Sequence, residues 1–125
     1  MKVKKLIAVN IVAIAAFWLQ GCSAEKFSDN NHSLNGVDFF IATITFHDTL
    51  KSSIQINNKG TVTEFVNSLN RSEVDGPQKG MGWDEIKLEG HHAKVVVLFS
   101  NGEVFSDVNS GTFYKLDKEL KKYWK

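Results

Sequence analysis

Hydrophobic and polar residues alternate along several short runs of this chain, and a period of two is typical of β-strands. The clearest run is 37–46, VDFFIATITF, which is rich in β-branched and aromatic residues. Its alternate positions form one apolar face: Phe40, Ala42, Ile44 and Phe46. A shorter run at 53–57 carries Ile54 and Ile56 on one face, so we predict that it pairs antiparallel with the first run.

Three later runs are also predicted to be strands, at 83–89, 94–99 and 103–108, and 112–116 is a candidate for one further short strand. The dipeptide Asn101-Gly102 separates two of them, and it is the strongest short signal for a β-hairpin. We expect a type I′ turn there, because such a turn needs positive φ at both central residues.

Residues 62–70 follow a helical period instead, with apolar residues at i, i+3, i+4 and i+7: Val62, Phe65, Val66 and Leu69. Thr61 and Glu64 have the spacing of a capping box at its start. A terminal helix is predicted from Lys118, with Asp117 as its cap.

The order β-β-α-β-β-β-α predicts a single α+β domain over 37–125, in which a small antiparallel sheet packs against two helices.

The amino-terminal segment has a different pattern. Three lysines (Lys2, Lys4 and Lys5) precede an apolar run over 6–18, which has the length of a signal-peptide core and is short for a bilayer span. Residues 22–36 are polar, rich in Ser and Asn, and without apolar period. We predict that they form a flexible tether with a root-mean-square span of roughly 20 Å.

Between these two parts lies Leu19-Gln20-Gly21-Cys22, which contains the only cysteine. Here the chain resembles the bacterial lipoprotein signal, with Leu19, Gly21 and Cys22 at the matching lipobox positions. The resemblance implies that residues 1–21 are a signal peptide cleaved between Gly21 and Cys22. It also implies a diacylglyceryl thioether on Cys22 and a fatty acyl group, such as palmitate, on the new amino terminus. Ser23 after the cysteine, in place of Asp, resembles the signal for the outer membrane of a Gram-negative cell, with the domain in the periplasm.

Cleavage would leave 104 of the 125 residues, which suits one small domain. Losing the three signal lysines would leave 12 basic and 14 acidic residues, a net charge of −2. This balance argues against a nucleic-acid partner. With Cys22 acylated, the domain has no thiol for a disulfide.

Three groups of side chains have the chemistry of catalytic or metal sites. His91 and His92 are adjacent, so on a strand they would point to opposite faces, and no HxH or HExxH spacing accompanies them. We interpret them as solvated turn residues. Asp84, Glu85 and Glu89 could act as paired carboxylates, but the alternation of Glu85 and Glu89 with Lys87 is typical of a solvated strand face.

The third group is His47-Asp48, a base and its orienting acid, with Ser52 or Ser53 as nucleophile. No G-x-S-x-G elbow accompanies it, and turn chemistry explains these residues. The glycines at 76, 80 and 82 lack the spacing of a phosphate loop. We therefore expect no metal and no cofactor.

Residues 71–82 form a long connection with three glycines and the only proline. Long connections of this kind are often functional. Pro77, Met81 and Trp83 make it the candidate recognition loop, because Trp and Met are enriched at protein interfaces.

The sequence predicts a membrane-anchored, non-enzymatic binding or interaction protein of the cell envelope. Its expected contacts are the membrane, through the lipid on Cys22, and an envelope protein. Two alternatives stay open: an inhibitor or immunity protein against a secreted toxin or hydrolase, and a small envelope hydrolase that uses His47 and Asp48 or Asp84 and Glu85.

Overall fold

The computed structural model describes residues 25–76, 83–107 and 111–124. These residues form an α+β domain, as predicted, built on one antiparallel sheet with the strand order β2-β1-β4-β5-β6-β7-β3. The strands are β1 (Phe39–Thr45), β2 (Ile54–Ile56), β3 (Val74–Asp75), β4 (Asp84–Gly90), β5 (Val95–Ser100), β6 (Val104–Asp107) and β7 (Phe113–Lys115). The helices are α2 (Phe27–Asn30), α3 (Lys59–Asn70), α4 (Lys118–Lys121) and the 3₁₀ turn η1 (Lys122–Trp124).

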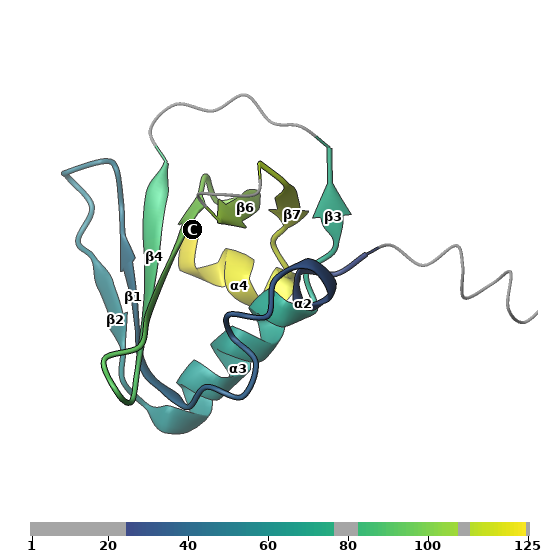
Figure 1. The fold of residues 1–125 in the computed structure, drawn as a ribbon. Coiled ribbons are helices and arrows are strands. Elements are labelled where there is room, and N and C mark those ends of the chain that lie inside the picture. Colours follow the sequence, from purple (N-terminus) through teal and green to yellow (C-terminus); the bar gives the residue numbers. More distant parts are fainter. Residues whose placement is uncertain (1–24, 77–82, 108–110, 125) are drawn as a thin grey trace, which may run out of the picture.

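Helices α2, α3 and α4 gather on one side of the sheet, which we call the inner face (Figure 1). The core lies between the helices and the inner face of the sheet. The sheet contributes side chains that are fully or almost fully buried: Ala42, Ile44, Ile56, Ile86, Leu88 and Leu98. Helix α3 contributes the predicted stripe of Val62, Phe65, Val66 and Leu69, all buried. None of the helices in the described parts of the chain is long and apolar enough to cross a bilayer.

Strand β1 departs from the predicted facing at one end. The pairing with β4 is irregular between Phe39 and Ile41, so Phe39 is buried at 3% exposure while Phe40 is 39% exposed. The prediction that Phe40 shares the core face of Ala42 and Ile44 is therefore wrong. A single irregularity reverses the facing because side chains in a strand alternate strictly.

Helix α3 begins three residues before the predicted start. Its N-cap is Asn58, whose side-chain oxygen accepts hydrogen bonds from the Thr61 backbone N–H at 3.1 Å and from the Thr61 hydroxyl at 3.2 Å. Thr61 is thus inside the helix, and the predicted Thr61–Glu64 capping box is wrong. Asn is as good an N-cap as Ser or Thr, so two start signals compete within four residues.

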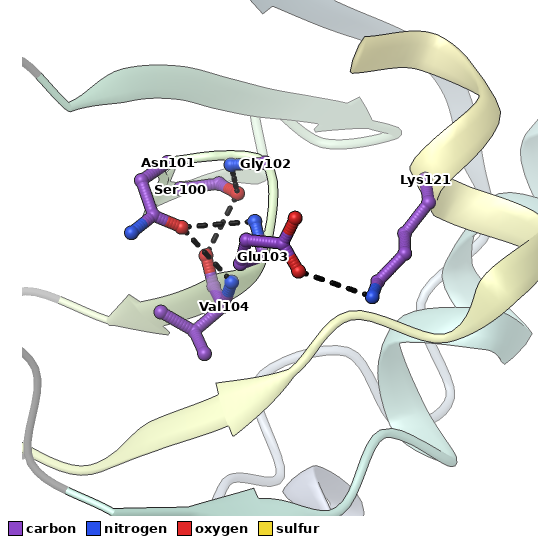
Figure 2. Close-up of polar contacts among 6 residues, drawn as sticks. All are labelled: Ser100, Asn101, Gly102, Glu103, Val104 and Lys121. Carbon is purple, nitrogen blue, oxygen red and sulfur yellow. Dashed lines mark hydrogen bonds and ion pairs between the residues drawn. The ribbon is translucent and has the colours of Figure 1, made fainter. Parts of the chain in front are cut away.

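The hairpin between β5 and β6 forms where it was predicted, but with a different turn (Figure 2). Gly102 has a positive φ and Asn101 does not, so the turn is not type I′. The Asn101 side-chain oxygen accepts from the backbone N–H groups of Glu103 and Val104, at 2.9 and 3.0 Å. The buried Ser100 hydroxyl adds a bond of 2.8 Å to the Val104 carbonyl, and Lys121 reaches Glu103 at 3.1 Å from α4.

The carboxyl-terminal helix docks on α3 through an ion pair. Arg71, at the end of α3, donates from Nε to Asp117 Oδ2 at 2.7 Å and from Nη2 to Ser68 Oγ at 2.8 Å. The hydrogen bond that Arg71 donates to Asp117 raises the pKa of Arg71 above its usual range. Asp117 is the N-cap residue of α4, as predicted, but its carboxylate is used in this pair instead of capping the helix.

The segment 25–36 is folded into the domain, so the prediction of a flexible tether over 22–36 is wrong for these residues. Phe27 is fully buried, and its ring meets Phe105 and Tyr114 edge to face at 5.2 and 5.0 Å. Leu34 is 2% exposed. Backbone bonds of 2.8 Å run from Val74 N to Glu25 O and from Phe27 N to Ser72 O, so the segment covers the free edge of β3.

We predict that Phe27→Ala lowers the free energy of unfolding by about 3–5 kcal/mol, because it removes a large ring from the core. The matched control is Phe40→Ala, which removes the same ring from a position that is 39% exposed and should cost much less. Urea unfolding of both variants and the wild type measures the difference. Equal midpoints for Phe27→Ala and the wild type would show that residues 25–36 do not belong to the fold.

Candidate functional site

Trp83 is the one predicted recognition residue that the structure describes. Pro77 and Met81 lie outside the described residues, and so do Gly21 and Cys22. Trp83 comes directly before β4 and is half-buried, with its indole stacked on Phe113 of β7. The two ring centroids are 5.6 Å apart and the planes are 25° from parallel.

This stack lines a hollow of about 400 Å³, which we call the aromatic hollow. Its lining residues are Trp83, Phe99, Ser106, Asp107, Gly111 and Phe113. Phe99 and Ser106 are directly paired across β5 and β6, so their side chains share a face of the sheet. The Ser106 hydroxyl donates to the Asp107 carbonyl at 2.8 Å, and Asp107 Oδ2 accepts from Asn31 Nδ2 at 2.7 Å.

The aromatic hollow lies at one end of the outer face of the sheet, opposite the helices. Strand β5 contributes an apolar column of Val95, Val97 and Phe99 to this face, and β4 contributes a charged column of Glu85, Lys87 and Glu89. The register pairs each charged residue with one apolar residue, Glu85 with Phe99, Lys87 with Val97 and Glu89 with Val95. The face is therefore amphipathic across the strands, and the three aromatic rings are concentrated at one end.

Two carboxylates flank the rings of the aromatic hollow. Glu85 is the cross-strand partner of Phe99, and Asp75 is the cross-strand partner of Phe113. Directly opposed residues of an antiparallel pair project on the same side with Cβ atoms about 5 Å apart. Lys87, the next basic residue on β4, is paired with Glu89 at 3.7 Å. The hollow is thus lined by aromatic rings, and Asp75 and Glu85 are register neighbours of two of them; we call these two carboxylates its rim charges.

Asp84, a candidate acid or base, holds three segments together. Its Oδ1 accepts from the His47 backbone N–H at 2.7 Å, and its Oδ2 accepts from the Trp124 indole at 2.8 Å. Trp124 also meets Phe46 edge to face at 6.3 Å. Asp84 therefore links β4 to the segment after β1 and to the carboxyl-terminal end, while Glu85 and Glu89 project to the other side of the strand.

His91 and His92 lie in the turn between β4 and β5, as predicted. His91 Nε2 is 3.5 Å from Asp38 Oδ2, which is also 3.5 Å from Lys59 Nζ. The turn is strained, because His92 and Ala93 have φ of 60° and 58° in the region that favours glycine. Within the described residues, no group of three or more His, Cys, Asp or Glu side chains could hold a metal ion.

His47 and Asp48 lie in the exposed connection between β1 and β2. Asp48 Oδ1 accepts from the Leu50 backbone N–H at 3.0 Å, and Asp48 O accepts from Lys51 N at 3.0 Å. These are the hydrogen bonds of a turn, which agrees with the turn interpretation of the sequence. Ser52 and Ser53 follow as exposed residues before β2.

Phe99 and Phe113 were not predicted as site residues. The pattern at 94–99 does not show which way Phe99 faces, because Val96 and Leu98 are apolar as well and both faces of the predicted strand are apolar. Phe113 is half-buried beside Trp83. Its strand pairs with β3, whose residues lie within the connection predicted over 71–82.

Comparisons of this chain with protein-family models, with curated proteins and with solved structures gave no match.

The strained turn gives a test of the backbone. We predict that Ala93→Gly raises the free energy of unfolding by about 0.5–1 kcal/mol, since relief of the left-handed strain exceeds the added chain entropy. Gly36→Ala is the reciprocal control, because Gly36 has φ of 69° and no atom lies within 4 Å of the position that an added Cβ would take. It should lower the free energy by about 1 kcal/mol. Thermal melting of both variants measures the effects, and a destabilised Ala93→Gly would contradict the turn geometry.

Proposed function

We propose that this protein is a lipid-anchored, non-enzymatic binding protein of the cell envelope, and that the aromatic hollow is its contact site. The hollow is the observation that carries the proposal. It is an open concave site of about 400 Å³ on the outer face of the sheet, with three aromatic rings and few polar groups. Sites for ligands or partner side chains have this size and this lining.

The anchor is supported by the order of features along the chain. A basic start, an apolar run and the sequence Leu19-Gln20-Gly21-Cys22 come shortly before Glu25, the first residue that the structure describes. Two or more acyl chains on Cys22 would give a stable anchor, whereas a single chain binds marginally. The resemblance at Ser23 favours the periplasmic face of an outer membrane.

The arrangement of the candidate catalytic carboxylates also fits a binding role better than it fits a role in hydrolysis. Both oxygens of Asp84 accept structural hydrogen bonds, and Asp48 accepts the bonds of a turn. Glu85 lies on the outer face beside Phe99, while Asp84 bonds to Trp124. Adjacent strand residues point to opposite faces, so this pair is poorly placed to act on one substrate.

We predict that the mature protein begins at a lipidated Cys22, and that Cys22→Ser abolishes both processing at this site and stable membrane association. Mass spectrometry of the amino-terminal peptide and fractionation of membranes measure these effects. A Cys22→Ser protein that matures and sediments with membranes like the wild type would contradict the anchor.

The contact site can be tested in living cells with a photo-crosslinking amino acid. We predict that the probe at position 113 gives crosslinked products with an envelope component, because Phe113 lines the aromatic hollow. The control position is 50, since Leu50 is an apolar residue that is 93% exposed and lies outside the hollow. Gel mobility and mass spectrometry identify the products. Equal crosslinking from both positions would show that the hollow is no special contact surface.

A further inference from the structure

We propose that the aromatic hollow recognises an organic ammonium group, and that its source is the headgroup of a phospholipid in the membrane that holds the anchor. The inference rests on the proposed function and names the chemistry of the same site. It depends on two independent observations, the charge and rings around the hollow and the short distance between the hollow and Glu25, the first described residue.

The first observation is the chemistry of the hollow. Trp83, Phe99 and Phe113 all line one space, and an ammonium group is attracted to the face of an aromatic ring. Asp75 and Glu85 are the cross-strand neighbours of two of these rings. Carboxylates next to aromatic rings favour a cation over an anion or a neutral group. The hollow is therefore complementary to a small organic cation.

The second observation is the position of the hollow relative to the anchor. Glu25 lies beside Val74, with a hydrogen bond of 2.8 Å, and Val74 lies beside Tyr114, the neighbour of Phe113. Two strand spacings, about 10 Å, thus separate Glu25 from the β7 strand of the hollow. Glu25 follows Cys22 by three residue positions, and an extended chain covers at most about 10 Å over that distance. An acylated Cys22 would hold the hollow within about 20 Å of the bilayer surface, where phospholipid headgroups are concentrated.

The ligand chemistry can be tested on the mature chain with Cys22→Ser, which removes the lipid. We expect phosphocholine to shift the NMR signals of the Trp83 indole and of residues 99 and 113 in a saturable way. Glycerol phosphate carries the same phosphate without the ammonium group and should leave these signals in place. Equal shifts with both compounds, shifts elsewhere on the domain, or no shifts would overturn the ammonium site.

Two pairs of variants test the residues. Asp75→Asn/Glu85→Gln should weaken phosphocholine binding about fivefold, since it removes both rim charges. The control Glu64→Gln/Glu119→Gln removes two charges from the helical side and should change the affinity less than twofold. Phe113→Leu, which keeps the apolar volume but removes the π-face, should weaken binding about three- to tenfold, and Phe40→Leu should have little effect. A response of the controls equal to that of the site variants would overturn the assignment to these residues.

The source of the ammonium group is tested with vesicles. The mature chain, coupled through Cys22 to a maleimide lipid, should show the same signal changes on phosphatidylcholine vesicles but not on phosphatidylglycerol vesicles. A response to free phosphocholine without a response to phosphatidylcholine vesicles would overturn the lipid source. Because the coupling is chemical, this test is separate from lipidation in cells. If Cys22 is found unmodified in cells, the proposed anchor fails even when the titration succeeds.

Discussion

The burial of Phe27 is the contact on which the arrangement of this domain depends. Its ring fills the space between Phe105 of β6 and Tyr114 of β7, and the backbone of residues 25–27 pairs with residues 72–74. One aromatic side chain therefore joins the amino-terminal segment to the strands at one edge of the sheet. It also covers a strand edge that would otherwise be open to pairing with another chain. A largely polar segment is thus attached to the domain through the burial of a single Phe side chain.

The same contact determines how the sheet presents its outer face. Because β3 is held between the amino-terminal segment and β7, Phe113 faces outward next to Asp75. On the other side, Asp84 binds the His47 backbone and the Trp124 indole on the inner side of β4, which leaves Trp83 and Glu85 on the outer side. Two structural contacts on the inner face, one at Phe27 and one at Asp84, therefore position the rings and charges of the aromatic hollow on the outer face.

The sequence predicts the elements of this fold whose apolar residues recur at a regular spacing. It does not predict the features that depend on the burial or facing of a single residue. The α3 stripe and the strands on either side of Asn101-Gly102 were recognised because several apolar residues share one spacing. Phe27 and Leu34 stand alone among polar residues, so no period reveals that they are buried. The irregularity at Phe39–Ile41 and the two-residue strand β3 are likewise local features that tertiary contacts select. The aromatic hollow combines residues from four separate segments, so only Trp83 carried a signal in the sequence.

A weak site is sufficient if the domain is held at a membrane by its anchor. Rings and exposed carboxylates each contribute little binding free energy in water, so the hollow alone would bind an ammonium group weakly. An anchored domain meets headgroups at the high effective concentration of the bilayer surface, and weak contacts are then occupied without any gain in intrinsic affinity. Anchor and hollow would have different tasks: the acyl chains hold the protein at the membrane, and the hollow selects which side of the domain faces the lipid. With the hollow on the membrane, the exposed edge at β2, at the opposite end of the strand order, would remain available to other envelope components.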